Sequence, residues 1–165
     1  MLTRARAYHD DRIEYQRHDL DEVELPAGLF DVVYSSLTLH YVTNLAHLLG
    51  QVQRALVPGG LFVFSVEHPI FTAPTRPGFV KAAGGRLVWP LDCYLIEGER
   101  VTDWLAPGVV KHHRTITSYV HGLRRAGLAF VDLIEWGPTA DQIDTTPAWA
   151  TEIERPPFLL VAACT

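Results

Sequence analysis

Two apolar runs with a helical pattern between them constrain the fold more than any other feature of the sequence. Residues 30–36 (FDVVYSS) and 61–67 (LFVFSVE) are short, mostly apolar and contain β-branched residues. Such runs are typical of strands buried on both faces, as in a parallel sheet. Over residues 45–56, leucine, valine and alanine recur at three- and four-residue steps, as on one face of an α-helix. Strand, helix and strand in this order predict a right-handed crossover unit, and therefore an α/β fold.

The ends of this helix are marked in the sequence. Thr43 or Asn44 stands where a capping residue is expected, and Pro58-Gly59-Gly60 is expected to stop the helix. Similar patterns predict the rest of the chain: helices over 2–8 and 115–126, the latter ending at Gly127, and strands over 12–18, 129–136 and 158–164.

Residues 69–110 do not follow these patterns. Five prolines and five glycines break up the segment, and aromatic residues are interleaved among them. A connection of this length is too long for a simple loop. We therefore expect a lid or insertion that contains short strands, with its aromatic residues either walling an apolar acceptor pocket or covering the sheet edge.

Composition narrows the class of protein. The chain has 165 residues, 48% of them hydrophobic, which suits a single domain with a real core. A net charge of −5 without a lysine or arginine run argues against a nucleic-acid partner. No apolar run reaches the roughly 20 residues that span a bilayer, so no membrane contact is expected. Cys93 and Cys164 match no zinc or disulfide framework, which favours reduced thiols in a cytoplasmic protein.

Three features together resemble the class I S-adenosylmethionine-dependent methyltransferases. They are Asp19-Leu20 at the end of a predicted strand, FDVVYSSLTLHYV at 30–42, and RALVPGGLFVFSVEHP at 54–69. The last predicted helix and the last two strands resemble the end of the same fold. The resemblance implies one domain over residues 1–165, and S-adenosylmethionine as the cofactor.

The resemblance begins at the third strand of the family. The sequence contains no GxGxG motif, which in the family follows the first strand. It therefore implies an incomplete Rossmann-like sheet, mostly parallel with an antiparallel C-terminal strand and without the first two strands of the order 3-2-1-4-5-7-6. We expect either that the strand at 12–18 pairs directly with 30–36, or that two chains pair through the exposed edge as a homodimer.

The resemblance also implies cofactor contacts. Asp19 and Leu20 match positions that contact the adenine, whereas the residue type of Asp19 on its own favours a turn-capping role. Ser35, Ser36 and Leu37 lie at the end of the fourth family strand, near the methionine part and the transferred methyl group. Ligands of open α/β sheets bind at this edge.

Four residues are candidates for the catalytic machinery: His40, Glu67, His68 and His113. A histidine near neutral pKa suits proton removal from an acceptor hydroxyl. The alternatives are that His40 closes a strand-to-helix turn, that His68 packs under the lid, and that His113 caps the next helix. No HxxxH or HExxH spacing occurs, so no metal site is expected.

The predicted function is methyl transfer to a small-molecule acceptor. Where many amino-directed methyltransferases carry Asn/Asp-Pro-Pro-Tyr, this chain has Ser36-Leu37-Thr38-Leu39. The difference lowers the case for methylation of nucleobase or amide nitrogens and leaves oxygen, carbon or other small-molecule acceptors open. One alternative is a non-catalytic or inactive truncated protein of the same fold that cannot bind the cofactor alone. Another is a different Rossmann-type enzyme, such as a nicotinamide dehydrogenase.

Overall fold

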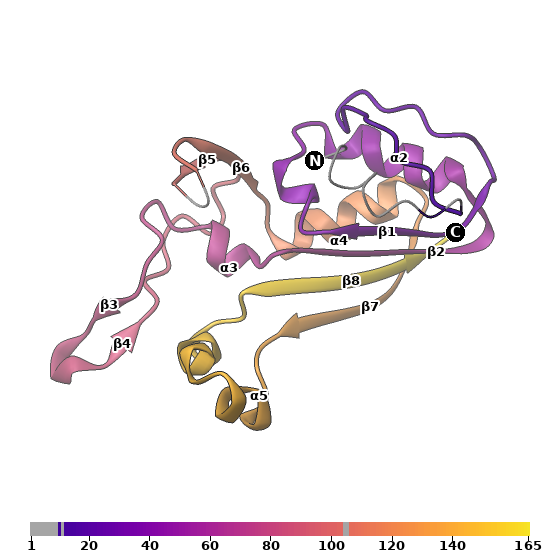
Figure 1. Ribbon diagram of the computed structural model, residues 1–165. Coiled ribbons are helices and arrows are strands. Elements are labelled where there is room, and N and C mark those ends of the chain that lie inside the picture. The colour runs from indigo at the N-terminus through magenta and orange to yellow at the C-terminus, as the bar shows by residue number, and fades with distance from the viewer. Residues whose placement is uncertain (1–9, 11, 104–105) are drawn as a thin grey trace.

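A mixed four-stranded sheet forms the centre of the computed structural model, which describes residues 10, 12–103 and 106–165 (Figure 1). The strand order is β1-β2-β8-β7. β1 and β2 are parallel, whereas β8 runs antiparallel to both of its neighbours. This arrangement confirms the predicted α/β sheet and its antiparallel C-terminal strand. The strands are β1 (Phe30–Ser36), β2 (Leu56–Glu67), β7 (Ala129–Trp136) and β8 (Phe158–Cys164).

Two helices, α2 (Leu45–Ala55) and α4 (Ile116–Arg125), lie on the same face of the sheet (Figure 1). Their apolar sides bury the core against alternate residues of the strands, including Phe62, Phe64 and Leu159. The alternation is clearest in β8, where every second residue is buried.

Local signals set the limits of both helices. Asn44 caps α2 by accepting from the His47 N–H at 3.3 Å, and Thr115 caps α4 by accepting from the Ser118 N–H at 3.1 Å. Gly127 follows α4 with a φ of +83°, a left-handed conformation that glycine adopts without the steric cost of a Cβ. The predicted cap Asn44 and the predicted stop at Gly127 are thus confirmed, whereas Thr115, and not His113, caps the start of α4.

The opposite face of the sheet leaves large apolar side chains in solvent. Val32 is 57% exposed, Tyr34 69% and Ile134 52%. Within the described residues, no strand pairs with the outer edge of β1. This face and this edge are therefore the least covered parts of the sheet.

Two connections extend from one end of the sheet. The first joins β2 to α4 and contains short elements. Among them is a small hairpin of Val80–Lys81 and Leu87–Val88, which projects away from the sheet (Figure 1). The second joins β7 to β8. The elements of the first are α3 (Pro69–Thr72), β3 (Val80–Lys81), η2 (Ala83–Gly85), β4 (Leu87–Val88), β5 (Gly98–Thr102) and β6 (Val109–His113), and those of the second are α5 (Ala140–Thr145) and η3 (Pro147–Glu154).

The strand predicted over residues 12–18 is wrong. These residues carry no strand, and β1 pairs with β2 rather than with them. Their side chains still alternate, because Gln16 Nε2 donates to Glu14 at 2.6 Å and Gln16 Oε1 lies 2.7 Å from His18 Nε2. An alternating pattern without a partner strand to pair with does not make a ladder. The helix predicted over 2–8 lies outside the described residues.

The limit between α2 and β2 also differs from the prediction. The helix ends at Ala55 and β2 begins at Leu56, five residues before the predicted strand. The register against β1 shifts between Phe30 and Val32, opposite the Pro-Gly-Gly segment. Proline and glycine there interrupt the pairing rather than delay the strand.

Candidate functional site

The parallel strands β1 and β2 end together, with Ser36 opposite Ser65, at the edge where ligands of open α/β sheets bind. Four hollows lie along this edge, and each shares lining residues with the next. We call them the β1 groove, the open-face hollow, the aromatic hollow and the insertion hollow.

The β1 groove, of about 310 Å³, lies between β1 and the segment that precedes it. Leu20, Ser35 and Ser36, three of the five residues predicted to contact the cofactor, line it together with His18. Asp19 and Leu37 are their immediate neighbours in the chain. The structure therefore brings the two predicted cofactor segments to one groove.

The segment 19–25 is fixed to α2 by hydrogen bonds. Asp21 Oδ1 accepts from the Asn44 N–H at 2.6 Å, and the Leu25 N–H donates to Gln51 Oε1 at 3.0 Å. Val23 between them is buried. These contacts hold one wall of the β1 groove in place.

Asp19 has a defined role in this segment. Its Oδ1 accepts from the Asp21 N–H at 3.0 Å, and its carbonyl accepts from the Glu22 N–H at 3.3 Å. The turn-capping interpretation of Asp19 is thus confirmed. The side chain is exposed at the turn that carries Leu20.

Leu37, just after β1, adopts a left-handed backbone conformation with a φ of +50°. Its N–H donates to Ser65 O at 2.9 Å and to Ser65 Oγ at 3.2 Å, which ties the turn to β2. A non-glycine residue in this region is uncommon, and such residues cluster at functional sites. Ser36 and Leu37 of this turn line the open-face hollow.

The open-face hollow, of about 280 Å³, lies on the uncovered face of the sheet. It shares Tyr34 and Ser36 with the β1 groove, and Trp136 and Phe158 with the aromatic hollow. It therefore lies between the end of β1 and the neighbouring ends of β7 and β8.

The aromatic hollow, of about 380 Å³, has walls that include Phe71, Trp136, Trp149 and Phe158. Its polar lining consists of Glu67, Glu152 and Arg155. The strand register explains part of this set. Glu67 of β2 lies opposite Phe158 of β8, which lies opposite Trp136 of β7, so the three side chains share one face of the sheet.

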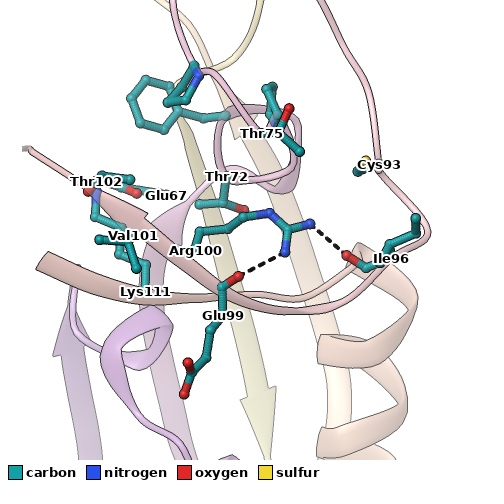
Figure 2. A pocket seen from close by; sticks show the side chains of 13 residues that line it. Glu67, Thr72, Thr75, Cys93, Ile96, Glu99, Arg100, Val101, Thr102 and Lys111 are labelled. Atoms are coloured by element: carbon teal, nitrogen blue, oxygen red, sulfur yellow. Dashed lines mark hydrogen bonds and ion pairs between the residues drawn. The ribbon is translucent and has the colours of Figure 1, made fainter. Parts of the chain in front are cut away.

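The insertion hollow, of about 260 Å³, lies under residues 69–102 and shares Glu67 and Phe71 with the aromatic hollow. Figure 2 shows Lys111, Thr72 and Arg100 around it. The Arg100 guanidinium donates to the carbonyls of Ile96 and Glu99, which fixes the loop before β5 (Figure 2).

Glu67 is the predicted catalytic residue that lines two of these hollows. It is 7% exposed and its Oε1 accepts from Lys111 Nζ at 2.6 Å. Lys111 is 2% exposed and lies 5.9 Å from the ring centres of Tyr41 and Phe71. Glu67 Oε2 is buried and has no hydrogen-bond partner among the described residues. A buried acceptor without a partner is costly, and it is a natural contact for a ligand.

His40 is buried and its Nδ1 lies 3.3 Å from the Glu67 N–H, from which it accepts. Burial, and then the nearby charges of Lys111 and Arg114, lower the pKa of His40 from 6.5 to about 3. A neutral ring that accepts from the Glu67 backbone helps to position the end of β2.

The other two histidines are held in a similar way. His68 Nδ1 accepts from the Ile70 N–H at 3.0 Å, and its Nε2 lies 2.9 Å from Glu135 Oε1. His113 Nε2 donates to Tyr94 O at 2.9 Å, which leaves Nδ1 to accept from Thr72 Oγ1 at 2.8 Å. Burial lowers the pKa of both rings. The residues that line the four hollows do not include these two histidines or His40.

Arg155 is a site residue that the sequence reasoning missed. It is buried, donates to Glu152 Oε2 at 2.7 Å and places its guanidinium carbon 4.3 Å from the Trp89 ring centre and 4.5 Å from that of Phe71. Its Nε is buried without a hydrogen-bond partner among the described residues. In the sequence, Arg155 is marked only by its position directly before the two prolines that lead into the last strand.

Two kinds of feature are absent from the described residues. These residues hold no group of three or more histidine, cysteine or acidic side chains placed to bind a metal ion. Nor do they contain a helix that is long and apolar enough to cross a membrane.

Comparisons with known proteins agree with this geometry. A methyltransferase-domain family profile matches residues 1–64. The solved structure of an S-adenosylmethionine-dependent methyltransferase from Mesorhizobium loti is 54% identical, with a TM-score of 0.96 over 100% of this chain and 76% of that chain. A structure from Listeria monocytogenes with the same family assignment is 33% identical, with a TM-score of 0.90 over 100% of this chain and 75% of that chain.

An uncharacterised protein of Haemophilus influenzae is 31% identical over 146 residues, which are 85% of this chain and 56% of that protein. The chain thus spans little more than half the length of this relative. The sheet order and the groove at the end of β1 define a class I methyltransferase fold. The chain belongs to the S-adenosylmethionine-dependent methyltransferases, and S-adenosylmethionine is the cofactor of that family.

The described residues fit part of this cofactor. The β1 groove combines an apolar wall, including Leu20 and Val33, with the hydroxyl groups of Ser35 and Ser36. An apolar slot beside hydrogen-bonding groups suits a molecule that has both an adenine ring and a polar amino-acid end. The lining of the β1 groove therefore suits the part of the family cofactor that would lie against these residues.

Proposed function

We propose that the protein transfers a methyl group from S-adenosylmethionine to a small-molecule acceptor. The observation that carries the proposal is the 54% identity to a methyltransferase structure over the whole of this chain. The line of hollows supports it, because the open-face hollow lies between the β1 groove and an aromatic hollow that suits an organic acceptor.

In this proposal Asp19 and Leu20 hold the adenine, and Ser35, Ser36 and Leu37 lie beside the methionine part. The bound cofactor supplies a methyl group activated on a sulfonium. The turn at Leu37 is tied to Ser65, so its backbone is fixed before the cofactor binds. A fixed turn orients donor and acceptor, which is most of what such a transfer requires.

Glu67 is the residue we propose to receive the acceptor's proton. An acceptor lone pair forms the new bond to the methyl carbon, and the carbon–sulfur pair stays on sulfur. The proton that the acceptor loses passes to Glu67 Oε2, the carboxylate oxygen that has no hydrogen-bond partner among the described residues. Lys111 holds the other oxygen at 2.6 Å and fixes the orientation of the carboxylate.

The three histidines take positioning roles in the same proposal. His40 supports the Glu67 backbone, His68 begins α3, and His113 joins Thr72 to Tyr94. None of the three needs to change its protonation state in the reaction.

The proposal extends to the insertion, the oligomeric state and the cellular location of the protein. Residues 69–110 act as a lid over the acceptor, since Phe71 lines the aromatic hollow and the Trp89 ring centre lies 4.3 Å from the guanidinium carbon of Arg155, another lining residue. Two copies of the chain pair along the outer edge of β1. The protein acts in the cytoplasm, without nucleic acid, which its net charge of −5 and its two free cysteines, Cys93 and Cys164, support.

The test is calorimetric titration of the purified chain with S-adenosylhomocysteine, with a thermal melt beside it. A ligand concentration of about 100 times the Kd adds about 2.7 kcal/mol to the free energy of unfolding and raises the melting temperature. Leu20→Asp is expected to abolish binding, and the exposed turn residue Glu22→Gln is the control. A chain that melts cooperatively and binds nothing would instead support the non-catalytic alternative.

A further inference from the structure

We propose that the aromatic hollow takes a flat, uncharged heteroaromatic acceptor that carries both a hydrogen-bond donor and a carbonyl oxygen, as a ring lactam does. The inference rests on the proposed function, because it names the acceptor class of the same site. Shape, unmatched polar atoms and charge balance each support it.

The walls of the hollow suit a flat ring. Trp136 and Trp149 meet at 83° with ring centres 6.0 Å apart, and Phe158 lies 5.6 Å from Trp136. Rings at these angles offer both faces and edges to a planar ligand. The volume of about 380 Å³ lies at the small end of the range for ligand pockets, which limits the acceptor to a few fused rings.

Two buried polar atoms of the lining residues have no hydrogen-bond partner among the described residues. One is an acceptor, Glu67 Oε2, and the other is a donor, the Nε–H of Arg155. Leaving either unpaired costs free energy that a ligand with the matching group recovers. A ligand with an N–H or O–H and a carbonyl oxygen satisfies both once a small turn of the two side chains brings these atoms, which solvent does not reach in the structure, to the wall of the hollow.

The charges of the lining favour a ligand without net charge. Arg155 already faces Glu152 at 2.7 Å, and Lys111 faces Glu67 at 2.6 Å. A carboxylate or phosphate would enter a site whose cations already have carboxylate partners, and it would lose its own hydration. A neutral ligand adds no unmatched charge.

The position of Arg155 is fixed before a ligand arrives. Its guanidinium carbon lies 4.5 Å from the Phe71 ring centre and 4.3 Å from that of Trp89, and its NH1 is held by Glu152. A donor held in one direction selects the ligand by geometry as well as by polarity.

Calorimetry with three probes of one size tests the proposal on the unmodified protein. The probes are 2-quinolinone, with donor and carbonyl, 1-methyl-2-quinolinone, with the carbonyl alone, and 2-naphthoate, an anion. We expect 2-quinolinone to bind, and each of the others to bind at least about tenfold more weakly, because one missing partner leaves a buried group unpaired. Equal affinities, a preference for 2-naphthoate, or no binding of 2-quinolinone would overturn the proposal.

A pair of variants locates the binding. Arg155→Lys keeps the charge and removes the Nε–H, so the affinity for 2-quinolinone is expected to fall about tenfold. Arg54→Lys, at an arginine on α2 that pairs with Glu24, is the matched control and is expected to change nothing. Equal effects of the two substitutions would place the bound probe elsewhere.

Titration of the same preparation with S-adenosylhomocysteine separates this inference from the proposed function. Binding of S-adenosylhomocysteine without 2-quinolinone overturns the acceptor class and leaves methyl transfer standing. Binding of 2-quinolinone without S-adenosylhomocysteine overturns methyl transfer by this chain and leaves the ligand class of the hollow standing.

Discussion

Glu67 and Lys111 are a buried ion pair, and their value to the fold depends on both being present. Removing two charges from water costs several kcal/mol per ion, and the attraction between them repays this only while the pair is intact. Loss of one partner leaves the other charged in a site that is almost closed to solvent, since Lys111 is 2% exposed and Glu67 7%.

We therefore expect Lys111→Met to lower the free energy of unfolding by about 3–5 kcal/mol. Urea denaturation at neutral pH measures the change. The double variant Lys111→Met with Glu67→Gln, in which no buried charge is left alone, is expected to recover most of the loss. A single variant as stable as the unmodified chain would show that solvent reaches Glu67.

The neutral histidines make stability depend on pH. His40 has a pKa of about 3 in the folded chain and 6.5 as its ordinary value, so the unfolded chain binds more protons between these limits. The free energy of unfolding is therefore expected to fall as pH is lowered from 6.5, by up to about 1.4 kcal/mol per pH unit from this group.

His40→Gln is expected to reduce that slope between pH 5 and about 6.5 in urea denaturation, because glutamine binds no proton in this range. His121→Gln, at an exposed histidine of α4, is the control. The interpretation fails if both variants keep the slope of the unmodified chain.

Elements were predictable where a local pattern coincided with the tertiary environment. The strands at 30–36, 129–136 and 158–164 have the limits that their apolar runs predict. Residues 12–18 failed, because their alternation predicts only an extended chain, and a strand also needs a partner to pair with.

The site was less predictable than the fold. Ser36 follows from the rule that ligands lie at the ends of parallel strands, whereas Leu20 was expected only from the family resemblance; the β1 groove contains both. Arg155 could not be placed, because its role depends on Phe71 and Trp89, far away in the chain. His40, His68 and His113 were candidates on residue type alone, and the sequence could not show that all three rings are buried away from the four hollows.

The first turn of helix α4 depends on the side chain of Thr115. Thr115 caps it and also donates to Glu97 Oε1 at 2.7 Å. Thr115→Ala is expected to cost about 1–2 kcal/mol, because the first turn then lacks its side-chain acceptor. Thr117→Ala, at an exposed position of the same helix, is the matched control and is expected to be nearly neutral in thermal unfolding. Equal losses would argue against the cap.

The whole molecule has a covered and an uncovered face of its sheet. Within the described residues, both helices of at least ten residues lie on the covered face, and β1 has one unpaired edge. An uncovered apolar strand at an edge tends to pair with another strand, and charged side chains prevent this.

We therefore expect the chain to associate with rising concentration in sedimentation equilibrium, and Val32→Lys on β1 to suppress the association. Val131→Lys, at an exposed position of β7 on the opposite edge, is the control and is expected to leave it unchanged. A monomer at every concentration would overturn pairing along β1.

The connection between β7 and β8 supplies Trp149, Glu152 and Arg155 to the aromatic hollow, whereas the β1 groove is built from residues before α2, from α2 itself and from β2. Separate stretches of chain thus build the two ends of the line of hollows. Mutation can remodel one end while the other is inherited intact. Proteins that diverged from a common ancestor of this chain could keep one donor and acquire new acceptors by replacing a single surface connection.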